Sequence, residues 1–452
     1  MPTEGRGRSR TRREPAQPRL LVADDAGRIL DHPFLLAAGS SWDAPEPLGE
    51  TSPAPDGLQL VFLPGRAPLG VDPSSGRIEP VTRFDFEGRR FRPHAVAAVL
   101  PPAHLRLLLP ACERASGAPA LPLRGYTAVG LAGDAFRVAA RRIDPHSHWD
   151  PARFQASEIE PAVAAHLARF PHNGLVAQLA HCARDYGCCT AANFFLGTWE
   201  AALPVSPDCD ARCLGCISEQ AGESPSPQQR LGRAPGAGEI AEAAVYHLER
   251  AEPGMVSFGQ GCEGEPSLHA GRIAEAIRAI RARTQRGTIH MNTNGSRPEA
   301  LAELAAAGLQ SVRVSLCSAH AEIFDAYHRA AFGLETVEDF ARRAREAGLF
   351  VSLNLLVFPG LTDRVEELEA LAGLLERCRL PMVQLRNLDL DPARLLSALP
   401  GPGGRCLGMG GFVAELARRL PELEIGSFNR FRHEFEGRLA PGRTNENLPS
   451  VS

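Results

Sequence analysis

The feature that most limits how this chain can fold is a regular alternation of apolar runs and amphipathic segments between residues 200 and 390. The apolar runs have the length of strands, and they lie at 201–206, 254–261, 288–295, 311–319, 350–360 and 382–390. Strands that alternate with amphipathic helices predict a parallel sheet covered by helices. Six such units are too few for a closed eight-fold barrel, so we expect a partial (β/α)6 TIM-type barrel. The run at 423–428 is a candidate for one further strand.

The rest of the chain has a different texture, and we delimit the barrel at residues 198–430. Residues 19–149 are rich in Pro and Gly and contain short apolar runs, which predicts a β-rich accessory domain. Helical spacing of apolar residues follows at 150–197, which we interpret as a helical connector. We expect residues 1–18, which are basic and polar, to form a disordered tail and residues 431–452 to form a C-terminal tail.

Composition narrows the functional classes. The net charge of the 452 residues is −4, so no basic surplus favours nucleic acid, although the Arg-rich N-terminus offers a contact for an acidic partner. The chain has no lysine, which excludes a lysine Schiff base. No apolar run reaches the roughly 20 residues that cross a bilayer, and the N-terminus lacks an apolar signal segment. We therefore expect a cytoplasmic protein whose eleven cysteines bind metal or carry out redox chemistry rather than form disulfides.

Unusual residues follow each predicted strand. The first strand ends in Cys209, Cys213 and Cys216, the second in "GQGCEGEP" and the third in "NTNG". Polar residues also follow the fourth, fifth and sixth strands, in "RVSLCS", "LNLLVFPG" and "QLRNLDLDP". Active sites of parallel α/β sheets lie beyond the carboxyl ends of the strands, so these groups are expected to meet at one rim.

The spacing CxxxCxxC after a first strand, followed by Gly264-Glu265-Pro266 after the second, resembles the radical S-adenosylmethionine (SAM) superfamily. The resemblance covers about residues 200–390. Within the superfamily, the motifs are most similar to those of the branch that includes molybdenum-cofactor-biosynthesis and sulfatase-maturing enzymes. That branch has TNG on strand three, VSL on strand four and an Asn before Pro-Gly on strand five. It implies an enzyme in which a [4Fe–4S] cluster cleaves SAM reductively, and a 5′-deoxyadenosyl radical abstracts hydrogen from a substrate. The reductant would be a flavodoxin or a ferredoxin.

The cysteine count agrees with this chemistry. A cubane cluster has four irons, and full protein ligation takes four thiolates. Three cysteines leave one iron open, as a catalytic metal site keeps one position for substrate. In the superfamily, the amino and carboxylate groups of SAM occupy that iron.

The resemblance also implies further contacts with SAM. Glu265 matches the acid that binds the SAM ammonium through a charge-assisted hydrogen bond, and Gly264 and Pro266 belong to the same motif. The remaining candidates lie at the ends of the third to fifth strands: Asn292, Thr293, Asn294, Arg313, Ser315 and Asn354. Two positions depart from the family pattern. Gly215 stands where an aromatic residue usually precedes the third cysteine, and Ser352 stands where some relatives have lysine.

Other readings of the cysteines remain open. The triplet would form a structural zinc site if His181 or Cys262 completed it, and a cluster-binding family member without turnover is a third possibility. Cys182, Cys188 and Cys189 could hold a second metal or pack in the core. For Cys262 and Cys317, which are expected near SAM, we favour inert packing. We interpret His146 and His148 as parts of a surface loop. The substrate is not specified, and peptide or small-molecule substrates are favoured over RNA.

Overall fold

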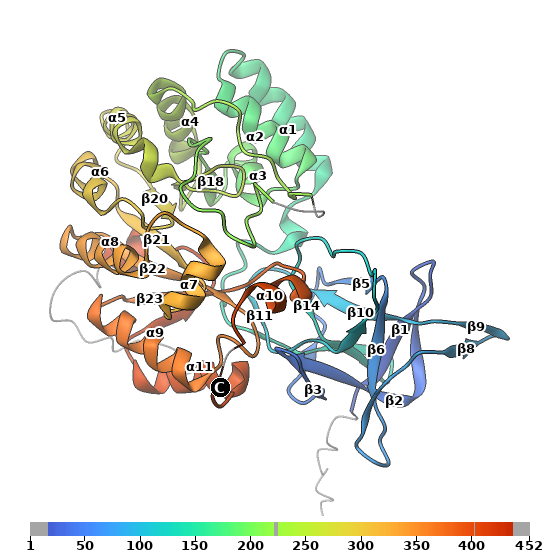
Figure 1. Cartoon of the computed structure of the whole chain (residues 1–452). Helices are drawn as coiled ribbons and strands as arrows, with labels where there is room; N and C mark the ends of the chain where they lie inside the picture. Colours follow the sequence, from blue (N-terminus) through green and yellow to red (C-terminus); the bar gives the residue numbers. More distant parts are fainter. Residues whose placement is uncertain (1–16, 221–224, 402, 437–452) are drawn as a thin grey trace, which may run out of the picture.

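The computed structural model describes residues 17–220, 225–401 and 403–436. Most of the basic tail expected at 1–18, and residues 437–452 of the expected C-terminal tail, lie outside this part. Two sheets organise the described chain, one parallel and one antiparallel (Figure 1). Among the described residues, no helix combines the length and apolarity needed to span a membrane.

The parallel sheet contains seven strands whose spatial order is their order in the chain. They are β18 (Glu200–Ala202), β19 (Met255–Phe258), β20 (Thr288–Thr293), β21 (Ser311–Leu316), β22 (Phe350–Val357), β23 (Met382–Asn387) and β24 (Glu424–Gly426). The expected strands are thus present. The first, expected over 201–206, is shorter, because Pro204 has no N–H to continue the ladder after Leu203 pairs with Ser257.

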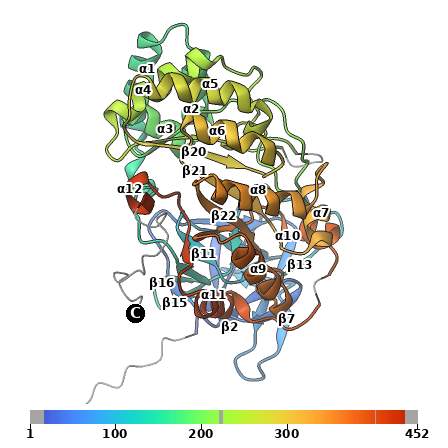
Figure 2. The same ribbon diagram turned by 90° about the vertical axis from the view of Figure 1, so that its left-hand side faces the viewer.

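Helices cover one face of this sheet, as Figure 2 shows from the side. They are α4 (Ala237–Arg250), α5 (Ala270–Arg281), α6 (Leu301–Ala307), α8 (Leu334–Glu346), α9 (Val365–Arg377) and α11 (Gly408–Arg419). The strand side chains that pack in the same cluster are Ala201, Val256, Phe258, Ile289, Met291, Val312, Val314, Leu316, Val351, Leu353, Leu355, Val383 and Leu385. Burial of this apolar surface is the main favourable contribution to folding of the region.

The opposite face of the same strands is polar. Side chains alternate between the two faces of a strand, and the register aligns these residues across the sheet. They are Glu200, Ser257, His290, Asn292, Ser311, Arg313, Ser315, Ser352, Asn354, Gln384 and Arg386. Parallel sheets that are covered on both faces usually carry apolar residues on both. Here one face of the sheet is a row of hydrogen-bonding groups.

The segment after β24 bridges the first and sixth strands. Asn429 donates to Glu200 Oε1 (2.8 Å) and accepts from Gln384 Nε2 (3.0 Å). The following helix, α12 (Arg432–Phe435), corrects the expected tail at 431–452. Phe435 is buried and stacks on Phe350 with ring centroids 4.6 Å apart, which anchors the segment.

Helix α7 (Ala321–His328), which follows β21 and precedes α8, was not expected from the sequence. Residues 150–197 contain η1 (Pro151–Arg153), α1 (Ala156–Arg169), α2 (Gly174–Asp185) and α3 (Cys189–Leu196), which extend the helical layer beyond β18. Short helices η2 (Pro266–His269), η3 (Pro298–Ala300) and α10 (Pro392–Ala398) complete the helices of the described chain.

Residues 19–142 form the antiparallel part. Its thirteen-stranded sheet contains β1 (Arg19–Ala23), β2 (Ile29–Ser41), β3 (Ala44–Pro47), β4 (Ser52–Pro53), β5 (Gln59–Leu63), β6 (Arg66–Val71), β7 (Ile78–Pro80), β10 (His94–Val99), β12 (Leu109–Pro110), β13 (Cys112–Arg114), β14 (Tyr126–Thr127), β15 (Val129–Ala132) and β16 (Ala135–Val138). Two small pairs join β8 (Phe84–Phe86) to β9 (Arg89–Phe91) and β11 (His104–Arg106) to β17 (Ala140–Arg142).

This antiparallel part packs on the segments that follow β22 and β23. The buried Arg106 guanidinium donates to the carbonyls of Tyr126 (3.2 Å) and Leu388 (3.2 Å). Arg66 pairs with Asp391 at 2.9 Å, with both side chains less than a tenth exposed. The N-terminal residues therefore lie beside the carboxyl end of the parallel sheet, where the predicted site lies.

A buried polar cluster ties the end of this part to the C-terminus. Asp144 accepts from the backbone N–H groups of Ser427 and Phe428 and pairs with Arg430 at 3.1 Å. His146 Nδ1 lies 2.7 Å from Asp144 Oδ1, and its Nε2 lies 3.2 Å from Glu434. His146 thus lies in a partly exposed loop, as expected, and its side chain links that loop to Glu434 near the C-terminal helix.

This cluster predicts a stability that depends on pH. The Asp144 and Glu434 carboxylates raise the pKa of His146 to about 9, above its unfolded value of about 6.5. The stabilisation is then complete below about pH 6.5 and is lost as the pH rises through 9. We expect the His146→Gln variant to lose roughly 1–2 kcal/mol at pH 6 and much less at pH 10, measured by urea denaturation. The exposed His181→Gln variant is the control, and an equal loss at both pH values would contradict the prediction.

Candidate functional site

The three cysteines of the triplet lie in the loop that follows β18. All three are half-buried and none forms a disulfide. A turn brings the last two together, with the Cys216 N–H donating to the Cys213 carbonyl at 3.2 Å. The Sγ atom of Cys216 lies 3.5 Å from Ser218 Oγ and 3.9 Å from a guanidinium nitrogen of Arg230.

Glu263, which sequence reasoning overlooked, joins the ends of the first two strands. Its Oε2 accepts from the N–H groups of Val205 and Ser206, and its Oε1 accepts from those of Gly259 and Gln260. A carboxylate offers about four lone-pair positions, and here backbone groups take all of them. Glu263 therefore holds the start of the cysteine loop, at residues 205–206, close to the start of the loop that contains Gly264, at residues 259–260. An acid within a glycine-rich loop after a buried strand was the available signal.

Gly264 allows these two loops to touch. Its N–H donates to the Ser206 carbonyl, and the N–H of Glu265 donates to the Asp208 carbonyl, both at 2.7 Å. A Cβ atom at position 264 would lie 1.9 Å from the Asp208 oxygen. Only glycine permits this approach of one backbone to another.

Glu265 accepts three hydrogen bonds from its neighbours. Its Oε1 accepts from Ser267 N (2.9 Å) and Thr293 Oγ1 (2.6 Å), and its Oε2 accepts from Asn294 N (2.7 Å). One of about four lone-pair positions, on Oε2, is left. Burial raises the pKa of this carboxyl group, and the bonds from Ser267 and Thr293 oppose that shift.

The third strand end joins the same cluster. Asn294 Nδ2 donates to Asp210 Oδ1 within the cysteine loop at 2.8 Å, so residues 293 and 294 contact both loops. Asn292 is different, because its amide donates to the Phe258 carbonyl and its Oδ1 lies 3.1 Å from His290 Nε2. Its two polar atoms are thus engaged within the sheet, and its contact with SAM stays a prediction.

Helix α7 packs against the cysteine loop from the other side. Backbone N–H groups of Arg212 and Leu214 donate to the carbonyls of His328 and Tyr327, both at 3.0 Å. A Cβ atom at Gly215 would lie 2.7 Å from the Tyr327 hydroxyl, so this tyrosine explains the glycine that departs from the family pattern. Apolar residues spaced by three and four in "AEIFDAYH" were the signal for this helix.

The remaining candidates lie on the polar face of the sheet. Ser315 Oγ accepts from Asn354 Nδ2 at 3.2 Å, so these two residues form a pair. Arg313 instead donates to Gln384 Oε1 at 3.2 Å and joins the network that includes Asn429. Two buried atoms on this face, Arg313 Nε and Asn354 Oδ1, have no hydrogen-bond partner among the described residues. Buried polar atoms without partners are uncommon and indicate a surface suited to a polar ligand.

The chemistry of the three thiols suits a positively charged metal group. Burial raises the pKa of Cys209 to about 11, and burial with the neighbouring Cys216 and Cys209 raises that of Cys213 further. Thiolates so placed need a cationic partner. Across the described chain, no three His, Cys, Asp or Glu side chains converge on a single ion.

The second cysteine group lies apart from the triplet. Cys182 and Cys262 are both buried and belong to the same hydrophobic core cluster. His181 lies on the exposed side of α2, where it contacts Asp185 and Tyr186. Among the described residues, neither His181 nor Cys262 is grouped with the triplet in a set of ligands for one metal ion.

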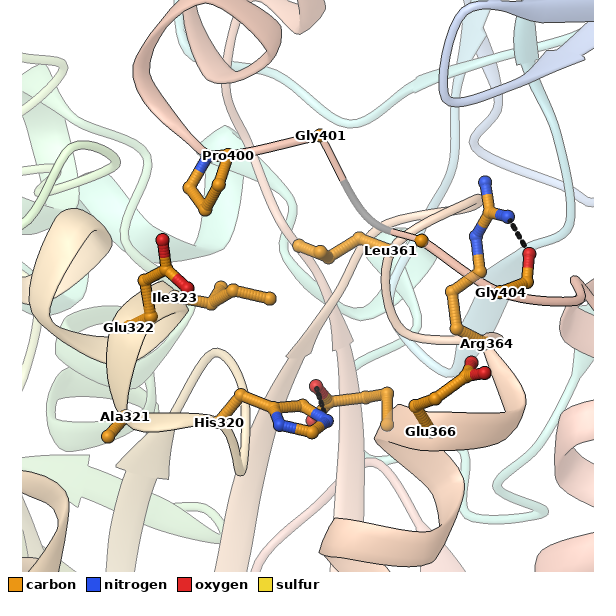
Figure 3. A pocket seen from close by; sticks show the side chains of 12 residues that line it. His320, Ala321, Glu322, Ile323, Leu361, Arg364, Glu366, Pro400, Gly401 and Gly404 are labelled. Carbon is orange, nitrogen blue, oxygen red and sulfur yellow. Dashed lines mark hydrogen bonds and ion pairs between the residues drawn. The ribbon is translucent and has the colours of Figure 1, made fainter.

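A pocket of about 440 Å³ is lined in part by the first residues of α7, Ala321, Glu322 and Ile323. Figure 3 shows Ile323 and Leu361 pointing toward each other across it, and Arg364 reaching the Gly404 carbonyl, a contact of 2.7 Å. Glu367, beside it, accepts from Ser318 Oγ and Ala319 N and so holds the start of α7. The first residues of α7 thus line this pocket, whereas its last residues, Tyr327 and His328, contact the cysteine loop.

Comparison with known proteins places this geometry in context. Residues 203–374 match the model of the Radical SAM superfamily. A GTP 3′,8-cyclase 2 of Pseudomonas aeruginosa is 33% identical over 164 residues, which cover 36% of this chain and 46% of the relative. A GTP 3′,8-cyclase of Listeria welshimeri is 31% identical over 170 residues, with the same coverage. The chain spans about half the length of these curated relatives.

Solved structures show more distant similarity. A radical SAM methyltransferase from Sphaerobacter thermophilus is 19% identical, with a TM-score of 0.37 over 50% of this chain and 65% of that chain. A methylornithine synthase is 13% identical, with a TM-score of 0.36 over 52% and 68%.

The contact at Gly264 yields a testable expectation. Because the alanine Cβ would meet a backbone oxygen, we expect Gly264→Ala to separate the loops and cost about 2 kcal/mol. It should also at least halve the iron bound after anaerobic reconstitution, measured by iron analysis beside a thermal melt. Gly271→Ala in α5, where a Cβ meets nothing within 4 Å, is the matched control. Full iron content in the Gly264 variant would show that the contact is dispensable.

Proposed function

We propose that the protein is a radical SAM enzyme that binds a [4Fe–4S] cluster, because residues 203–374 match the model of the Radical SAM superfamily. When bound, the cluster and SAM together supply a one-electron reductive cleavage that lets the enzyme abstract hydrogen from a substrate. The observation that carries the proposal is the loop cluster, in which three free thiols stand beside Gly264, Glu265 and Asn294.

In this proposal Cys209, Cys213 and Cys216 hold the cluster, and the superfamily pattern assigns SAM to the neighbouring loops. The free lone pair of Glu265 Oε2 is the acceptor for the SAM ammonium. The backbone of Gly264, which no side chain covers, together with Pro266, borders the methionine part. Thr293 and Asn294 position Glu265, while Ser315, Asn354 and Arg313 offer polar contacts on the inner face; Asn292 supports their strand.

The polar face of the sheet, which offers these contacts to SAM, is also the surface that we assign to a substrate bound beside SAM. Arg313 Nε and Asn354 Oδ1 lack partners in the described chain, and a polar substrate would supply them. We infer a peptide or a small molecule rather than RNA, because the net charge is −4. The GTP cyclases share only about a third of this chain, so their substrate is not transferred to it.

The domain plan forms part of the proposal. We infer that residues 198–430 form a partial (β/α)6 barrel, that 19–149 form an accessory domain and that 150–197 connect them. Support comes from Arg106 and Arg66, which fix the accessory part beside the carboxyl ends of β22 and β23, where a substrate enters such a sheet. A flavodoxin or ferredoxin of the cytoplasm is the proposed reductant.

The decisive experiment is anaerobic reconstitution followed by reduction in the presence of SAM. We expect about four irons and four sulfides per chain and the formation of 5′-deoxyadenosine, measured by chromatography. The Cys213→Ala variant should lose both, whereas Cys406→Ala, whose thiol contacts Ser41 and Asp363, should retain them. Zinc in place of iron would contradict the proposal, and a cluster without SAM cleavage would indicate a family member without turnover.

The role of Glu265 can be tested separately. Because Glu265→Gln removes the charge that faces the SAM ammonium, we expect SAM to bind about tenfold more weakly. Isothermal titration of the cluster-loaded protein measures this. The exposed Glu299→Gln is the control. Unchanged affinity together with a lower melting temperature would mean that Glu265 only holds Thr293 and Asn294 in place.

A further inference from the structure

The C-terminal end of α7 contacts Cys213, the middle cysteine of the triplet. His328 Nδ1 is 3.3 Å from Cys213 Sγ, and the ring is 2% exposed. Two backbone bonds, from Arg212 and Leu214 to the carbonyls of His328 and Tyr327, fix the helix to the loop. The ring therefore has little freedom to turn away from the sulfur.

The direction of the hydrogen bond follows from the chemistry of the sulfur. A cysteine that ligates iron is a thiolate, which accepts hydrogen bonds and donates none. An unprotonated Nδ1 would set a lone pair against that negative sulfur, so Nδ1 carries the proton. Nε2 is buried without a partner among the described residues, so moving the proton there would leave a buried donor unsatisfied as well.

We propose that His328 is a positioning residue of the cluster site, which donates its Nδ1–H to the Cys213 sulfur and thereby raises the reduction potential of the cluster. Hydrogen bonds to the sulfur ligands are one of the means by which a protein sets the potential of an iron–sulfur cluster. The added electron increases negative charge on the sulfurs, so a donor stabilises the reduced form more than the oxidised form.

Tyr327 keeps this arrangement in register. Its hydroxyl occupies the space over Gly215, and its ring packs with Leu214 and Leu388 in one buried cluster. Loop and helix thus interlock, with a glycine on the loop where the helix supplies the aromatic ring. The histidine next in sequence is consequently held at the sulfur.

The inference rests on the proposed function, since it requires a cluster on Cys213. The first test uses wild-type protein labelled with ¹⁵N-histidine, loaded with cluster and reduced. Pulsed EPR should show a nitrogen coupling from histidine, and the coupling should disappear in His328→Asn while remaining in His247→Asn. His247 is buried in α4 and contacts the Trp199 carbonyl.

The second test compares midpoint potentials of loaded variants. We expect His328→Leu, which has no donor, to have a lower potential than wild type. His328→Asn should retain most of the wild-type value, because the asparagine amide lies near the position of Nδ1. A loaded wild type without histidine coupling, or a leucine variant with the wild-type potential, overturns the proposal. If the leucine variant does not load, the coupling in wild type decides; if wild type forms no cluster, the proposed function fails and this proposal with it.

Discussion

A sheet with one apolar and one polar face, both largely buried, is the constraint on which this structure depends. Buried polar groups must find partners, because an unsatisfied donor or acceptor costs about 1–3 kcal/mol. The chain meets this need with a network that runs from Glu200 through Asn429 to Gln384 and Arg313. The segment after β24 therefore supplies hydrogen-bond partners to the polar face of the sheet through Asn429.

Hydrogen bonds between protein groups connect the predicted cofactor loops to one another. Glu263 uses backbone donors from both loops, and Gly264 and Glu265 pair directly with the backbone of the cysteine loop. Asn294 adds a link from the third strand. Most of these bonds involve main-chain groups, so they depend little on the side chains of the bonded residues. They do bring the backbones close together, which leaves no room for a Cβ atom at the glycines between them. This explains why Gly215 and Gly264 stand where backbone or Tyr327 lies closest.

Local patterns in the sequence predicted the strands and most of the helices, because alternation and helical spacing depend on residues close together in the chain. The cysteine triplet, Glu265 and Asn294 could likewise be proposed as site residues from the sequence, since each follows the end of a predicted strand. The different setting of Arg313, joined to Gln384 rather than to the pair Ser315 and Asn354, depends on register across three strands. Single-sequence reasoning could not supply that register. Helix α7 was missed because its eight residues give a short periodic signal.

One consequence concerns where the polar groups of the sheet are concentrated. At the amino end of the polar face, Phe350, Met382 and Phe435 form a small apolar cluster. Because this apolar cluster takes the amino end, the hydrogen-bonding side chains of the face gather toward the carboxyl ends of the strands. The antiparallel part at residues 19–142 is held at the same end of the sheet by Arg106 and Arg66, so it borders this polar region.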